Sequence, residues 1–407
     1  MNLKKSKKIK MGKYLSIPNV LKESNEESGL DFKWGLSAMQ GWRVFMEDAF
    51  IYEPTFGHLK TFSLFLVLDG FGGNKFSNQV SRDLSQMILN QDIFKNLKDD
   101  TEYDAYELAE ALKQSLYNMD DKMREFPEID TCGCTVSGVL ITPQHFFMVN
   151  LGDSRTILCR EKRIMFETYD HLPWRYEERK RIEAAGGCIK GSRVNGMNIS
   201  RALGNFPLKN DNRKQKVSQI LSPEAEVNII KRTEKDDFIA IATDGIFNKL
   251  SNDDLINYMV KRIPYKKHLK ELAEDILDYC LHMNSKDNLT VMLIHFNQSV
   301  ITQEDDKISH DEQLDGKIRK LTNDFVDKEF ADGKCCYGWE ICFREMNKLH
   351  NDLFCDESNT QSYGISLKKG VIYDEFKRLT EAIRIKRRAE CLQKMQEQEA
   401  KKFKSSL

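Results

Sequence analysis

The sequence predicts an α+β domain, a β-sandwich covered by helices, with a small helical appendage at the C-terminus. Two observations lead to this fold class. From about Gly35 to Phe296, short apolar runs alternate with longer stretches whose apolar residues recur every three or four positions. Several short runs are apolar at nearly every position, which is typical of strands that are buried on both faces.

The strands are expected in apolar runs rich in Val, Ile, Leu and Phe: Phe62–Leu68, Cys134–Ile141, His145–Leu151, Phe238–Thr243 and Leu289–Phe296. Helices are expected where apolar residues lie three and four positions apart: Ser77–Gln91, Asp104–Met123, Trp174–Ala185 and Leu269–His282. These helices would cover the outer faces of the sheets.

The pattern changes after Phe296, where a polar segment leads to two or three helical stretches and a basic, glutamine-rich end. We therefore expect four parts. A basic N-terminal extension and leader would occupy residues 1–30, and the globular body residues 31–298. A helical appendage would follow at 299–385, and a basic, frayed tail at 386–407.

Charge and composition exclude several classes of protein. The chain has 62 Lys and Arg against 63 Asp and Glu, so no global field would recruit nucleic acid or an anionic membrane. No apolar run is long enough to span a bilayer, and the N-terminus lacks the apolar stretch of a secretory signal. The ten cysteines lack zinc-site spacing and are expected as reduced thiols. We expect an intracellular protein, cytoplasmic or nuclear.

Aspartates mark the ends of several predicted strands. Three apolar runs stop at or just before an aspartate and a small residue, and a fourth aspartate opens a run: Asp69-Gly70, Asp153-Ser154, Asp244-Gly245 and Asp287-Asn288. Any one such pair is better explained as a turn. Four together are harder to dismiss, and if the strand ends lie side by side they gather negative charge in one place.

Gathered carboxylates are costly unless protons or cations neutralise them. Oxygen ligands without a nearby His or Cys cluster favour hard cations such as Mg²⁺ or Mn²⁺ over zinc. The segment GWRVFMEDAF adds the acidic pair Glu47-Asp48 and, shortly before it, Arg43. A guanidinium at this place is a candidate fork for a phosphate group.

The ordered set of motifs resembles that of type 2C serine/threonine protein phosphatases. The segments are GWRVFMEDA, LDGFGG, NLGDSR, DHLP followed by ERKRIEAAGG, VNGMNISRALGN, ATDGIFNKLS and SKDNLTV. The resemblance covers roughly Gly12 to Phe296, so the body would be the catalytic domain. The appendage, including GISLKKGVIYDEFKRL, resembles more loosely the helical C-terminal domain of the animal alpha/beta-type members.

The resemblance implies a central β-sandwich flanked by antiparallel helices, with two Mg²⁺ or Mn²⁺ ions in a cleft. Asp69 would bridge the ions, Glu47 and the Gly70 carbonyl would complete one site, and Asp244 and Asp287 the other. Asp153, with Asp244, would hold a weaker third ion.

The resemblance also implies a reaction. Metal-activated water would attack the phosphorus of phosphoserine or phosphothreonine directly, without a phosphoenzyme. Arg43 would hold the substrate phosphate, while Asp48 and Asn288 would support the metal ligands. The expected partners are phosphorylated proteins, and the expected state is a monomer.

Three positions depart from the family pattern. Phe71 stands where the family has the histidine regarded as the proton donor to the leaving group, and Asn205 and Asn248 stand where it has aspartates. General acid catalysis is typically worth about 10²- to 10⁴-fold, so slower turnover is expected. The two neutral side chains lower the negative charge of the cleft, so a raised metal requirement is expected.

Alternatives remain open at this stage. One alternative is a pseudophosphatase, which would bind phosphoproteins without efficient turnover. Another is an enzyme whose metal cleft hydrolyses other phosphate esters. His171 is better explained as a residue that holds a loop than as a substitute acid. Gly12 fits a myristoylation pattern only if translation starts at Met11. The basic tail would be a solvated helix or, alternatively, a nuclear address.

Overall fold

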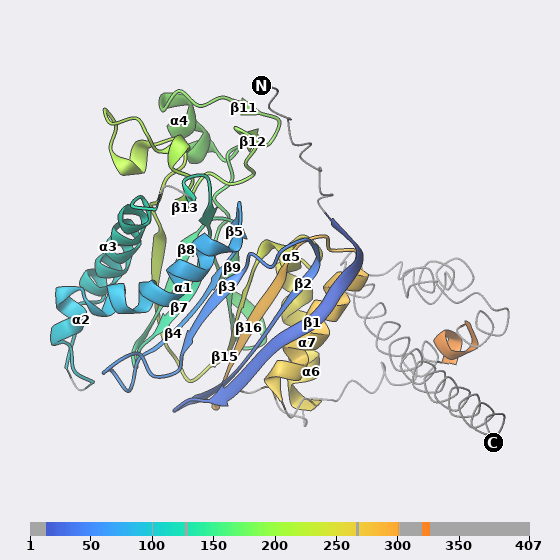
Figure 1. Ribbon diagram of the computed structural model, residues 1–407. Helices are drawn as coiled ribbons and strands as arrows, with labels where there is room; N and C mark the ends of the chain where they lie inside the picture. The colour runs from blue at the N-terminus through green and yellow to red at the C-terminus, as the bar shows by residue number, and fades with distance from the viewer. Residues whose placement is uncertain are drawn as a thin grey trace, which may run out of the picture. The chain divides into compact units, whose positions relative to one another are not determined.

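The computed structural model describes residues 14–99, 101–126, 129–265, 268–299, 301 and 320–325 (Figure 1). The chain divides into two compact units, Met1–Thr302 and Gln303–Leu407. Of the second unit only a helical stretch at 320–325 is described. The myristoylation pattern at Gly12 and nearly all of the predicted appendage and tail lie outside the described residues.

The first unit contains a six-stranded and a five-stranded sheet, and every strand pair in them is antiparallel. The six-stranded sheet has the order β1 (Tyr14–Ser28), β2 (Phe32–Arg43), β16 (Leu289–Phe296), β15 (Asp236–Ala242), β9 (Arg155–Arg160), β10 (Arg163–Glu167). The five-stranded sheet has the order β14 (Glu226–Lys231), β8 (His145–Leu151), β7 (Val136–Ile141), β4 (Ser63–Leu68), β3 (Ala49–Glu53).

The two sheets pack face to face as the predicted sandwich. Alternate side chains of both sheets meet in one buried cluster, among them Trp34, Phe65 and Ile239. In β4, Phe65 and Val67 face this interior, whereas Leu64 and Leu66 belong to a second cluster on the opposite face of the sheet. Because both faces of the strand are buried, its sequence is apolar throughout.

Helices cover the outer faces of the sandwich (Figure 1). The second cluster packs the five-stranded sheet against α1 (Asn74–Leu89), α2 (Asp92–Asn96) and α3 (Ala105–Met123). Helix α7 (Leu269–His282) packs on β2 and β16 of the other sheet, where α5 (Asp244–Phe247) and α6 (Asn252–Arg262) also lie. Asp104 begins α3 by accepting hydrogen bonds from two backbone N–H groups, as an N-cap residue does.

A smaller lobe stands at one end of the sandwich (Figure 1). This α4 lobe, residues 174–222, carries α4 (Tyr176–Ala184), the strand pair β11 (Ile189–Lys190) and β12 (Arg193–Val194), and the 3₁₀ turns η2 (Phe206–Leu208) and η3 (Lys216–Ser218). Its strand β13 (Leu203–Gly204) joins β6 (Gly133–Cys134) and β5 (Gly70–Phe71) in a three-stranded sheet. The lobe is thereby attached to the turn that follows β4.

The elements predicted from sequence are confirmed, with small shifts of their ends. The bounds of β8, β16 and α7 agree with the prediction, α4 is shorter, and Cys134–Ile141 is divided between β6 and β7. Six further strands of the two large sheets were not among the predicted ones: β1, β2, β3, β9, β10 and β14. Of these, β1 forms an edge of the six-stranded sheet. No helix among the described residues is long and apolar enough to cross a membrane.

Candidate metal centre

Three of the predicted aspartates meet at one end of the sandwich. Asp69 follows β4 directly, Asp153 lies two residues after β8, and Asp244 opens α5 after β15. One carboxylate oxygen of each lies within 4.8 Å of the other two. The cluster therefore draws ligands from both sheets and lies at the end where their strands stop.

Burial and mutual repulsion make this cluster electrostatically costly. Burial raises the pKa of Asp69 well above its usual range, and the neighbouring charge of Asp244 raises it further. The same two causes raise the pKa of Asp153. Burial, together with the charge of Asp287, raises the pKa of Asp244 to about 6. Converging, buried, oxygen-only groups of this kind fit a hard divalent cation, which would keep them ionised.

The backbone of Glu47 lies directly against Gly70, the residue after Asp69. A Cβ atom on Gly70 would lie 2.2 Å from the Glu47 carbonyl oxygen, so only glycine permits this approach of the two backbones. The Glu47 carboxylate accepts a hydrogen bond of 2.5 Å from the Gly73 N–H, and Ser77 Oγ donates to its carbonyl oxygen. These contacts fix Glu47 beside the turn after β4, outside the group of three aspartates.

Asp287 is brought to Asp244 in a similar way. A Cβ atom on Gly245 would lie 2.0 Å from the Asn288 carbonyl oxygen and 3.4 Å from Asp287 Cβ. The Asp287 carboxylate accepts a 2.6 Å hydrogen bond from Arg43 Nη2. The residue predicted to hold phosphate thus neutralises a predicted metal ligand, and Asp287 also lies outside the group of three.

Asp48 and Asn288 lie behind these ligands. Asn288 accepts a hydrogen bond from the Glu47 N–H, and its amide donates to the carbonyl oxygens of Gln40 and Phe45. The Asp48 carboxylate accepts hydrogen bonds from Thr243 and Thr290. Burial is the main cause that raises the pKa of Asp48 to about 7. Sequence reasoning missed both threonines, because residues more than 190 positions away carry no local signal.

The three departures occupy different surroundings. The Asn248 amide donates to Asp244 Oδ2 at 3.1 Å, so this residue touches the cluster directly. Asn205, in the left-handed region at φ 51°, donates instead to Met197 Sδ at 2.9 Å. Phe71 and Met197 pack against a small apolar cluster of the α4 lobe, Ile199, Ala202 and Leu221.

Asn198 is a site residue that sequence reasoning did not find. Its side-chain amide donates to Asp153 Oδ2 at 2.9 Å. It belongs to the loop of the α4 lobe that runs from β12 to β13. The lobe therefore contacts the acidic cluster through Asn198, and it packs on Phe71, two residues after Asp69.

Comparison with known families gives this geometry its context. The model of the family Protein phosphatase 2C matches residues 32–289, more than half of the sequence. The chain belongs to the protein phosphatase 2C family. This confirms the resemblance and the fold expected from the ordered motifs.

Relatives within the protein phosphatase 2C family include animal enzymes. Protein phosphatase 1B of Homo sapiens is 33% identical over 79% of this chain and 69% of its own length. Protein phosphatase 1A of Bos taurus is 35% identical over 78% of this chain and 85% of its own length. The serine-threonine phosphatase 2C of Toxoplasma gondii has a similar fold, with a TM-score of 0.58 and 21% identity over 70% of this chain and 98% of its own.

Proposed function

We propose that this family member hydrolyses phosphoserine and phosphothreonine in proteins with the help of Mg²⁺ or Mn²⁺. The observation that carries the proposal is the meeting of Asp69, Asp153 and Asp244 within 4.8 Å at the end of the sandwich. When bound there, two divalent ions supply an activated water and positive charge beside the phosphate.

Each ligand has a proposed place. Asp69 would contact both ions, because the charges of Asp244, Asp153 and Asp287 all act on it, and Glu47 and the Gly70 carbonyl would complete one site. Asp244 and Asp287 would complete the second site, which the close approach at Gly245 supports. Asp153 and Asp244 would hold a weaker third ion. Asn288 would orient Glu47 by accepting from its backbone N–H, and Asp48 would hold Thr243, the residue before Asp244.

Arg43 would bind two oxygens of the substrate phosphate with its planar fork. Its hydrogen bond to Asp287 supports this role, because the carboxylate fixes the guanidinium at the edge of the centre. The side chain is 39% exposed and so remains accessible to a substrate.

Phe71 cannot donate a proton to the leaving oxygen, so turnover would be slow. Serine and threonine alkoxides need that proton, whereas phenolates leave readily without it. The ring also packs against the α4 lobe. The missing proton donor is what favours the alternative, a pseudophosphatase that binds phosphoproteins without efficient turnover.

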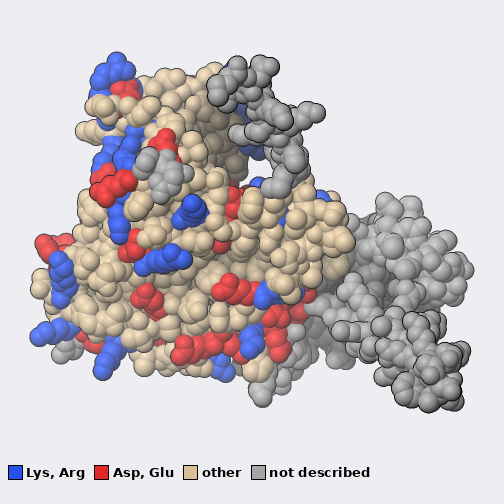
Figure 2. Space-filling model, viewed as in Figure 1, with Lys and Arg blue, Asp and Glu red and all other residues tan. Residues whose placement is uncertain are grey.

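The phosphorylated substrates would be intracellular proteins, cytoplasmic or nuclear. In the described part of the chain, the cysteines Cys132, Cys134, Cys159, Cys188 and Cys280 are all free thiols, which suits a reducing compartment. On the face drawn in Figure 2, acidic and basic side chains are interspersed over the sandwich, and basic ones gather on the α4 lobe.

The deciding experiment compares two substrates in Mn²⁺: a phosphothreonine peptide and an aryl phosphate. Turnover should be metal-dependent, should vanish in Asp69→Asn, and should be much weaker on the peptide. Restoring the acid in Phe71→His should raise peptide turnover by about 10²-fold or more and leave aryl turnover nearly unchanged.

Either of two results would change the proposal. An equal response of both substrates to Phe71→His would remove the proton-donor explanation. No turnover on either substrate, even with the histidine restored, would establish the binding-only alternative.

A further inference from the structure

Gly152, beside the acidic cluster, is held at both its N–H and its carbonyl group by a single histidine. The Gly152 N–H donates to Nδ1 of His171 at 3.0 Å, and the Gly152 carbonyl accepts from the His171 backbone N–H at 2.8 Å. Gly152 directly precedes Asp153. Its φ of 125° and the Thr135 side chain, 2.5 Å from where a Cβ would be, leave room for glycine alone.

The His171 ring has a defined orientation. Because Nδ1 accepts from Gly152, the neutral ring carries its proton on Nε2. Nε2 is buried without an aligned acceptor, and the atom facing it is Glu226 Oε1 at 3.3 Å. Contact with His171 lowers the pKa of Glu226 below its usual range. The carboxylate thus stays charged and holds the ring electrostatically.

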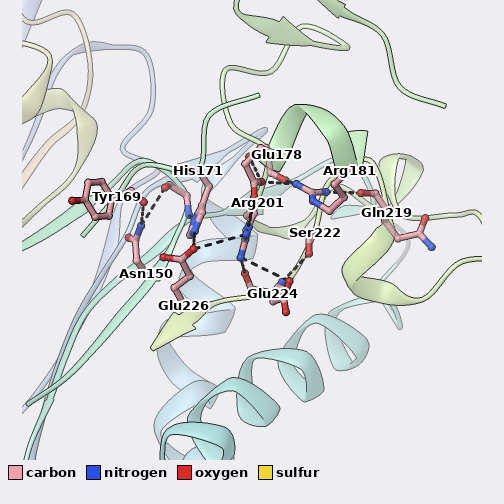
Figure 3. A network of polar contacts seen from close by, with 12 residues as sticks. Asn150, Tyr169, His171, Glu178, Arg181, Arg201, Gln219, Ser222, Glu224 and Glu226 are labelled. Carbon is pink, nitrogen blue, oxygen red and sulfur yellow. Dashed lines mark hydrogen bonds and ion pairs between the residues drawn. The ribbon is translucent and has the colours of Figure 1, made fainter. Parts of the chain in front are cut away.

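Glu226 lies at the exposed edge of a larger network of charged side chains (Figure 3). Arg201 lies 3.9 Å from Glu226 and donates to Oε1 of Glu178 at 2.7 Å. Arg181 and the Ser200 hydroxyl donate to the other oxygen of Glu178. Burial alone would raise the pKa of Glu178, but the two arginines outweigh it and lower that pKa to about 2.

The same network fixes the loop that reaches Asp153 from the other side. The Ser200 N–H donates to the His171 carbonyl at 2.9 Å, and two residues earlier the Asn198 amide donates to Asp153 Oδ2. His171 therefore contacts both segments that hold Asp153: the turn that carries it and the loop that binds its carboxylate.

We propose that His171 is a positioning residue that fixes the Gly152–Asp153 turn through its Nδ1, with Glu226 holding the ring, so that the Asp153 carboxylate is placed to bind a divalent cation. The inference rests on the proposed function only in taking Asp153 as a ligand. The proposal gives His171 no role as a metal ligand or as a group that binds substrate.

Two amide variants separate the contacts of the two ring nitrogens. In His171→Asn the shorter side chain can offer an oxygen near the place of Nδ1, so the contact to Gly152 is kept and that to Glu226 is lost. In His171→Gln the longer side chain reaches the place of Nε2 and leaves the Gly152 N–H without an acceptor. His145→Gln is the matched control, because His145 begins β8 at the end remote from Asp153.

The measurements are the number and affinity of bound Mn²⁺ ions, from the spin-resonance signal of free Mn²⁺, and hydrogen exchange at the Gly152 amide. Asp153→Asn identifies the binding event that depends on Asp153. In His171→Gln the same event should weaken by about 10- to 100-fold and Gly152 should exchange faster. His171→Asn and His145→Gln should stay close to the wild-type protein.

Three results would overturn the proposal: wild-type Mn²⁺ affinity in His171→Gln, equal losses in His171→Asn and His171→Gln that follow their thermal stability, or no effect of Asp153→Asn. Turnover is not one of the readouts. A protein that binds Mn²⁺ as expected but hydrolyses nothing would refute the proposed function and leave the role of His171 intact.

Discussion

At the residue scale, two substitutions that look alike in the sequence differ in the structure. Asn248 and Asn205 both stand where the resemblance in the sequence implied aspartates. Asn248 donates to the Asp244 carboxylate, whereas Asn205 donates to the sulfur of Met197, beside Phe71. The expectation that both weaken metal binding is therefore best supported for Asn248.

Restoring the charge at Asn248 should strengthen metal binding. Asn248→Asp adds a carboxylate beside Asp244, and a charge at this range is worth about 1–4 kcal/mol, so the half-saturating Mn²⁺ concentration should fall on the order of tenfold. A titration with Mn²⁺, in which the fraction of bound metal is followed, measures the half-saturating concentration. Asn205→Asp is the control and should change it much less, so equal shifts in both variants would contradict the assignment.

At the scale of elements, helix α4 is held within its lobe by buried charge. Its Glu178 is 4% exposed. It forms ion pairs with Arg181 of the same helix and with Arg201 of a later loop. Buried ion pairs of this kind are costly to break, because one partner is left uncompensated. The contribution of Glu178 to folding should therefore depend on pH.

The sign of that dependence follows from the lowered pKa. Glu178 has a pKa of about 2 in the folded protein against 4.5 ordinarily, so its stabilisation is complete above pH 4.5 and is lost as pH falls towards 2. Glu178→Gln should cost about 3 kcal/mol in free energy of unfolding near neutral pH, and the difference from wild type should shrink in acid.

Denaturant unfolding of both proteins at several pH values tests this. Glu183→Gln, on the same helix and in an exposed pair with Arg179, is the control and should cost about 0–1 kcal/mol. A difference between wild type and Glu178→Gln that does not change with pH would rule out the charge of Glu178 as the cause.

At the scale of the whole molecule, both apolar clusters of the sandwich lie between Phe32 and Phe296. A chain that ends at Thr302, the last residue of the first compact unit, should therefore fold alone. Thermal unfolding followed by circular dichroism should show one cooperative transition for it. A truncated chain that aggregates or melts without cooperativity would contradict this expectation.

The sequence predicted this fold where burial leaves a pattern. Strands buried on both faces, such as β8 and β16, are continuous apolar runs and were placed with their observed bounds. Strand β1 was missed because its residues are exposed or half-buried and its C-terminal half, KESNEES, is polar. Its pairing with β2 lies in backbone hydrogen bonds, which leave no pattern in the side chains.

In the acidic cluster, too, the sequence predicts the residues at strand ends but not their distant partners. The meeting of Asp69, Asp153 and Asp244 was foreseen, because turns after buried strands put acidic residues at strand ends. The partners that orient such residues, Asn198 on Asp153 and Thr290 on Asp48, come from distant segments. Their contacts depend on the packing of the α4 lobe and of both sheets, which no local pattern encodes.

The origin of the three clustered carboxylates in opposite sheets has a further consequence. Asp69 and Asp153 follow strands of one sheet and Asp244 follows a strand of the other, so the spacing between the sheets sets the distances between the carboxylates. That spacing is set by interior side chains such as Trp34 and Phe65. Substitutions deep in the apolar interior would thus change the distances between the three carboxylates, and with them the size of the cation that the proposed site would fit.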